Sequence, residues 1–147
     1  MPEAVRYVWA SAPFIRPAHM GIWQMNADLD ETAKQRIESE YGIYLPTLAI
    51  GPGWLHLVRQ FLDEAKICGL LDRVTVLQIK EKFGQLRIYF RGDNEHPSLH
   101  YLRRRVRALS DASLDVCEVC GKPGSHRTIN YLHLTRCDDC YAARRDA

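Results

Sequence analysis

Apolar residues recur every three or four positions in three stretches of the chain, which is the period of an amphipathic helix. Asp28 and Asp30 precede the first stretch as candidate N-caps, and Gly42 follows it as a C-terminal stop. Trp54 opens the second stretch, and Pro97 begins the third. The three apolar stripes are Ala33, Ile37 and Tyr41; Leu55, Val58, Phe61, Leu62 and Ala65; and Leu99, Leu102, Val106 and Leu109. Each stretch is therefore predicted to form a helix.

The period changes to two between the second and third helices, as it does in a half-buried strand. One side of residues 85–91 carries Leu86, Ile88 and Phe90, and the other side carries Arg87, Tyr89 and Arg91. Residues 74–80 are predicted to be the partner strand, joined through the loop 81–84. Gly84 supplies the left-handed residue of that loop. The two strands are expected to form an antiparallel hairpin with one solvated face.

Together these elements predict an α+β fold, a small antiparallel hairpin or sheet packed by two or three helices and followed by a zinc ribbon or knuckle. A lone hairpin is only marginally stable in water, so the helices must cover its apolar face. Residues 28–115 are expected to form the α+β domain and residues 116–147 the zinc-binding module. Residues 1–27 are rich in aromatic residues and proline, and we expect an N-terminal arm with a short edge strand near its start.

Two cysteine pairs near the C-terminus have the spacing of a zinc site. Cys117 and Cys120 are separated by two residues, as are Cys137 and Cys140, and sixteen residues lie between the pairs. Gly121 suits the tight turn that brings two thiolates onto one ion. Four thiolates complete a tetrahedron and leave no position open for substrate, so the expected cofactor is a structural Zn²⁺. The closing module contains little apolar material, and metal binding would supply its folding free energy.

Other cysteine and histidine roles are less consistent with this pattern. Two disulfides are the alternative, but paired cysteines in a reducing compartment usually hold metal. His126 and His133 lie between the pairs and could replace a cysteine, yet they are expected to be polar surface groups. Cys68 is expected to be an inert, buried thiol because no histidine lies beside it to activate it.

Composition and charge narrow the remaining function classes. The chain has 147 residues, of which 46% are hydrophobic and 26% charged, as in an ordinary globular protein. The formal net charge of +2 argues against a strongly basic nucleic-acid coat but permits a local patch. No leader-like segment and no apolar run of transmembrane length is present, so we expect a cytoplasmic protein without a membrane partner.

One basic cluster lies on the third predicted helix, on the side opposite its apolar stripe. It consists of Arg103, Arg104, Arg105 and Arg107, and the hairpin residues Lys80, Lys82, Arg87 and Arg91 would extend it if they lie on the same side. A solvated charged face is the simplest interpretation. The alternative is contact with phosphates or with an acidic protein surface, since arginine pairs bidentately with both.

Three short motifs of this chain occur together in a known family. They are Gly53-Trp54 at the start of a helix, the run from Lys80 to Arg87, and the run from Cys117 to Gly124 with its closing cysteine pair. Over residues 41–141 the chain resembles a family of small uncharacterised proteins of bacteriophages and prophages. In that family a tryptophan often precedes the second cysteine pair, where this chain has Tyr131 and His133. The resemblance brings no established activity, but it implies a host-cell cytoplasmic setting and a host protein as partner.

No motif of an enzyme is found. The chain has no nucleophile elbow, no phosphate-binding glycine loop and no His-Glu-x-x-His sequence, and the spacer between the cysteine pairs is too short for an HNH nuclease site. We therefore expect a non-enzymatic, zinc-containing interaction protein without a small-molecule substrate. The first hypothesis is that it binds and modulates a host protein, such as a defence complex. The second is that it binds nucleic acid and contacts phosphates through its basic cluster.

Overall fold

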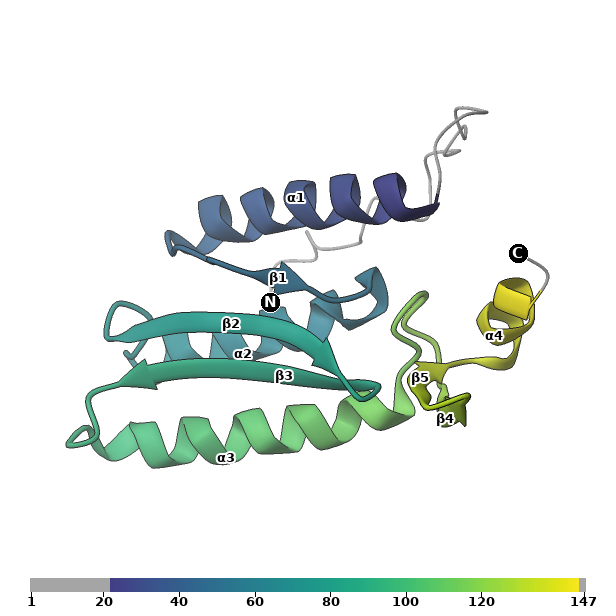
Figure 1. Ribbon diagram of the computed structural model, residues 1–147. Helices are drawn as coiled ribbons and strands as arrows, with labels where there is room; N and C mark the ends of the chain where they lie inside the picture. Colours follow the sequence, from purple (N-terminus) through teal and green to yellow (C-terminus); the bar gives the residue numbers. More distant parts are fainter. Residues whose placement is uncertain (1–21, 146–147) are drawn as a thin grey trace.

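A computed structural model describes residues 22–145, and the side chains of residues 31–143 within them (Figure 1). The edge strand expected near the start of the chain lies outside the described residues. The helices are α1 (Ile22–Tyr41), η2 (Pro52–Trp54), α2 (Leu55–Ile67), α3 (Pro97–Ala112), η3 (Ser113–Asp115) and α4 (Asp138–Arg145). The strands are β1 (Leu48–Ala49), β2 (Val74–Lys82), β3 (Gln85–Gly92), β4 (Ser125–Ile129) and β5 (Leu132–Arg136).

The described elements form an α+β fold, as predicted. β1, β2 and β3 make a three-stranded sheet in that order, and β4 and β5 make a separate two-stranded sheet. β2 and β3 are antiparallel, whereas β1 runs parallel to β2 and pairs through Leu48 and Ala49. This parallel strand was not predicted, because two residues are too few to show a period. The expected zinc-binding module is the β4–β5 hairpin with α4 at its end.

The helices lie on one face of the sheet and along its two edges. α2 lies behind the sheet in Figure 1, α1 runs beside β1, and α3 runs beside β3. All three predicted stripes face the core, where Ile37, Phe61 and Leu102 have no exposed surface. Phe90 of β3 lies against Phe61 of α2, with ring centroids 5.3 Å apart. The apolar side of the hairpin is thus covered, as its marginal stability in isolation required.

The other face of the sheet carries no described helix, and the strand register shows which side chains lie on it. Residues paired across two antiparallel strands point to the same side. The pairs on the open face are Thr75 with Arg91, Gln78 with Tyr89, Lys80 with Arg87, and Lys82 with Gln85. A bulge between Val76 and Gln78 shifts the register and turns Leu77 outward, with 45% of its surface exposed. We call this surface the open sheet face.

Two local predictions need correction. α1 begins at Ile22, so Asp28 and Asp30 lie within the helix and are not its N-caps. No proline or glycine stands between Ile22 and Asp28 to stop the helix, which therefore extends past the residues that prefer a cap. The predicted loop 81–84 is also shorter, because β2 continues to Lys82 and the turn is the two residues Phe83 and Gly84.

Candidate metal centre and open sheet face

The four cysteines of the C-terminal module come together as a metal-binding cluster. The Sγ atoms of Cys117, Cys120, Cys137 and Cys140 all lie within 4.8 Å of one another. The Sγ atoms of Cys120 and Cys137 are 3.6 Å apart, far beyond the S–S bond of about 2.05 Å, and all four thiols are free. Four sulfurs placed about 2.3 Å from one ion would be about 3.8 Å apart, so the cluster has the size of a tetrahedral thiolate site.

Local backbone turns hold the four sulfurs in place. After the first pair, Gly121 adopts a positive φ of 78° and its N–H donates to the Cys117 carbonyl at 2.9 Å. At the second pair, α4 begins at Asp138, directly after Cys137, and the Cys140 N–H in its first turn points at the Cys137 Sγ at 3.4 Å. N–H groups directed at sulfur stabilise a thiolate, as in other anion-binding turns. Both turns follow from sequence spacing, which is why the cluster was predictable.

The electrostatics of the cluster favour a bound cation. Burial raises the pKa of the Cys117 thiol, but the N–H groups of Cys137, Cys120 and Val119 outweigh it and lower that pKa to about 7. Burial and the neighbouring sulfurs raise the pKa of Cys140, and burial likewise raises that of Cys120. Cys117 thus ionises readily, while Cys120 and Cys140 resist a further negative charge. A metal ion at the centre would remove this conflict, because all four thiolates would bind it.

His126 and His133 do not belong to the cluster, which agrees with the prediction that four cysteines form it. Their rings stack on each other, with centroids 5.3 Å apart, on the side of the β4–β5 hairpin that meets the β2–β3 turn. The Nε2 of His126 is 2.9 Å from the Phe83 carbonyl oxygen, and the His133 ring meets the Phe83 ring edge-on with centroids 5.5 Å apart. They line the junction between the two modules.

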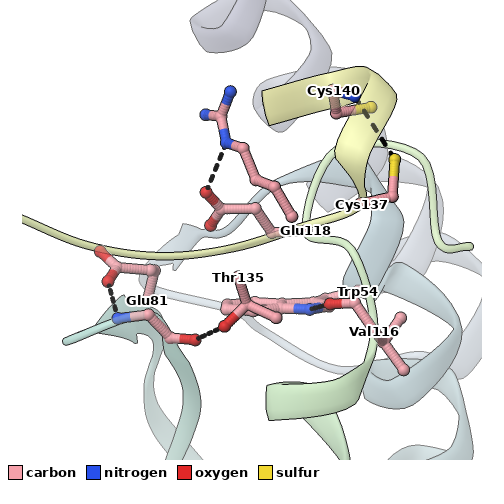
Figure 2. Close-up of polar contacts among 9 residues, drawn as sticks. Trp54, Glu81, Val116, Glu118, Thr135, Cys137 and Cys140 are labelled. Carbon is pink, nitrogen blue, oxygen red and sulfur yellow. Dashed lines mark hydrogen bonds and ion pairs between the residues drawn. The ribbon is translucent and has the colours of Figure 1, made fainter. Parts of the chain in front are cut away.

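That junction joins the three motifs that are distant in sequence. The indole of the buried Trp54 donates to the Val116 carbonyl at 2.8 Å (Figure 2). The Gly53 N–H donates to the Glu118 carbonyl at 2.8 Å. The fully buried Thr135 hydroxyl donates to the carbonyl of Gly84 at 2.5 Å. Each motif therefore supplies part of one packed joint between the sheet and the metal module. Sequence analysis did not predict these contacts, because nothing local links the partners.

A side-chain carboxylate also stabilises the turn at the junction. Glu81 Oε1 accepts a hydrogen bond from the Gly84 N–H at 2.6 Å, within the two-residue turn (Figure 2). Both turn residues have positive φ, 55° at Phe83 and 77° at Gly84, as a type I′ hairpin turn requires. Glycine was predicted here, whereas a phenylalanine in this conformation is unusual.

The structure divides the predicted basic cluster into separate groups. Arg105 forms an ion pair with Glu64 of α2, with its Nε 3.0 Å from Oε1, so it holds α3 to α2 and does not join the hairpin cations. Arg104 is exposed on α3 and is not among the residues that line the groove between α3 and β3 described below. Arg103 lies over the Phe90 ring and donates to Asn94 Oδ1 at 3.2 Å. Only part of the arginine run therefore faces the sheet.

A groove between β3 and α3 brings helix and hairpin cations together. It has a volume of about 410 Å³ and is lined by Leu77, Gln85, Arg87, Ile88, Tyr89, Phe90, Arg103, Val106, Arg107, Ser110 and Asp111. The Nε of Arg87 is buried there and has no hydrogen-bond partner among the described residues. Asp111, at one end, is the only carboxylate that the described residues contribute to its lining. Lys80 and Lys82 lie outside the groove on the adjoining open sheet face.

Comparison with models of protein families, with curated proteins and with solved structures finds no match for this chain. Across residues 22–145, no helix has both the length and the apolar character that crossing a bilayer requires. The residues of the chain itself therefore carry the functional argument.

Proposed function

We propose that this protein is a non-enzymatic, cytoplasmic nucleic-acid-binding protein that contacts phosphates through its open sheet face and contains a structural zinc ion. The observation that carries the proposal is the composition of that face. Its cations are Lys80, Lys82, Arg87 and Arg91, with Tyr89 among them, and its paired positions include no carboxylate. A polyanion complements such a face, because its phosphates can pair with the cations and meet no carboxylate that would repel them.

The division of the basic residues supports this choice of surface. The chain as a whole is near neutral, so a face with cations and no acid reflects a local segregation of charge. Arg103 and Arg107 line the adjoining groove and would add contacts beside β3. Arginine residues that can reach two phosphate oxygens at once suit this role.

The metal centre has a different role in this proposal. Four sulfur ligands select a soft or borderline ion, and tetrahedral sulfur coordination is the preferred geometry of Zn²⁺. With all four ligand positions taken by protein, the ion stabilises the module and does no chemistry on a substrate. The β4–β5 hairpin then serves as a fixed support on which the β2–β3 turn rests.

Removing charge from the open sheet face should weaken binding and its salt dependence together. We expect the double variant Lys80→Gln, Arg91→Gln to lose affinity for all nucleic-acid sequences alike. The slope of log K against log salt should fall by about 2, roughly one for each lost phosphate contact. Fluorescence anisotropy at several salt concentrations measures both quantities.

The matched control for this experiment changes the same net charge elsewhere. Arg36 of α1 and Lys66 of α2 are exposed and lie off the open sheet face. The variant Arg36→Gln, Lys66→Gln should bind as the wild type does. Equal losses in the two double variants would mean that only overall charge matters, and the open sheet face would not be the binding surface.

Binding and modulation of a host protein is the second candidate, and a different surface favours it. Tyr131 is 98% exposed at the tip of the β4–β5 hairpin, where it has a positive φ of 69°. Leu132 beside it is 45% exposed. An exposed aromatic residue next to an apolar one is typical of a protein-binding hot spot, and the resemblance to phage proteins is consistent with a host partner.

An affinity capture from bacterial lysate, with and without nuclease, separates the two candidates. If the second candidate holds, one protein should be retained at a fixed ratio after nuclease treatment. The Tyr131→Ser variant should lose it because the anchor ring is gone, while keeping its metal and its Tm. If nucleic acid co-purifies and no protein is retained after its digestion, this candidate is contradicted and the first is supported.

A further inference from the structure

We infer that the open sheet face binds single-stranded nucleic acid and holds its bases on the rings of Tyr89 and Phe83. The inference rests on the proposed function and names the form of its ligand. Phosphate contacts alone would accept a duplex, in which the bases are stacked inside. Exposed aromatic rings beside cations instead fit a strand whose bases are free to stack on protein.

The hairpin presents the combination of a cation and a ring twice in succession. Lys80 Nζ lies 5.8 Å from the centroid of the Tyr89 ring, and Lys82 Nζ lies 5.7 Å from the centroid of the Phe83 ring. The two lysines are two residues apart on one strand and so lie about 7 Å apart on the same side. The rings are farther apart, because Tyr89 pairs with Gln78 whereas Phe83 follows Lys82, a separation of roughly 16 Å along the hairpin. A nucleotide has a phosphate and a base, so each unit matches one nucleotide of an extended strand.

Phe83 is the feature that packing explains least well. Its ring is 62% exposed although its backbone has the left-handed conformation, which asparagine or glycine adopts more easily. Its ring meets that of His133 in a T-shaped contact, with ring planes 81° apart. A strained, exposed aromatic residue at a turn is consistent with a role in binding.

The groove beside β3 gives the strand a path next to the Tyr89 ring. Tyr89 is 39% exposed and lines this groove, together with Arg87, Arg103 and Arg107. The guanidinium groups of these three arginines would contact phosphates there, with Asp111 the one carboxylate that the described residues add to the lining. The strand would thus cross the open sheet face with bases toward the rings and phosphates toward these cations.

The test compares the affinity of the protein for four probes at one salt concentration, each used either with a fluorescein label or as a competitor of a labelled strand. They are a single-stranded oligonucleotide, its duplex, an abasic strand of the same length, and poly-L-glutamate. The abasic strand keeps the phosphates and removes only the bases. We expect the full-length wild-type protein to bind the single strand about ten-fold more tightly than the duplex or the abasic strand.

Two variants each remove one aromatic ring, and each is paired with a control variant that has another aromatic residue at the same position. Phe83→Asn places a residue that favours the turn, so its Tm should not fall, while affinity for the single strand drops about ten-fold. Phe83→Tyr should bind as the wild type does. Tyr89→Leu should lose about the same factor, and Tyr89→Phe should retain affinity. Neither loss should appear with the abasic strand.

Each contrary outcome separates the inference from the proposed function. Equal affinity for the intact and abasic strands, or for single strand and duplex, would overturn the stacking inference and leave phosphate recognition standing. Unchanged affinity in both Phe83→Asn and Tyr89→Leu would do the same. Binding to none of the nucleic acids, or to poly-L-glutamate alone, would overturn the proposed function and the inference together.

Discussion

Replacing Cys117 by serine should remove one equivalent of bound metal and unfold the C-terminal module. The pKa of the buried Cys117 thiol is lowered to about 7, so protons compete little with a metal ion for its sulfur at neutral pH. Structural zinc sites in small modules contribute about 10–16 kcal/mol of folding free energy, since the ligands are not assembled in the unfolded chain. We expect a loss of at least about 3 kcal/mol, which corresponds to about 10 °C in Tm for a chain of this size.

Metal content by mass spectrometry and Tm by calorimetry measure these two effects. Cys68→Ser is the matched control, because Cys68 ends α2 far along the chain from the cluster and is only half-buried. It should keep the metal and most of the stability. Full metal content with an unchanged Tm in Cys117→Ser would show that the four-thiolate assignment is wrong.

Gly53→Ala should destabilise the protein by more than about 3 kcal/mol, because the added methyl group has no room. A Cβ at Gly53 would lie 2.1 Å from the Cys117 carbonyl oxygen and 2.6 Å from the Gly121 nitrogen. Both are backbone atoms of the metal module and cannot rotate away. The joint would have to open, which would also break the partly buried hydrogen bond from the Trp54 indole to the Val116 carbonyl.

The effect of this clash is isolated by comparing the free energies of unfolding in urea of Gly53→Ala and Gly69→Ala. Gly69 has a positive φ of 70°, yet no atom lies within 4 Å of a Cβ built there. Gly69→Ala should therefore cost only the backbone strain, about 1 kcal/mol. Metal content tells whether the module still folds in Gly53→Ala after the joint opens. Equal losses in the two variants would contradict the tight joint.

Features that depend on residues close in sequence were predicted well. The cysteine spacing predicted the metal cluster, since each pair is closed by one local turn. The alternation along β3 predicted which side of the hairpin is apolar, and the stripe of α3 predicted its buried side. The predicted site included the whole arginine run of α3, however, whereas neighbours on a helix turn point in different directions. Arg105 joins Glu64, forty-one positions away, which no local pattern could indicate.

The sequence by itself determined the period of each element and the composition of the metal cluster, because both depend on contacts within a few residues. The tertiary structure decided which hairpin face stays open, through the placement of α2 behind it, and which cations share that face. It also decided that Gly53 and the Phe83–Gly84 turn meet the metal module, Thr135 included, at one joint. These relations depend on packing between distant segments, whose geometry is set only when the core closes.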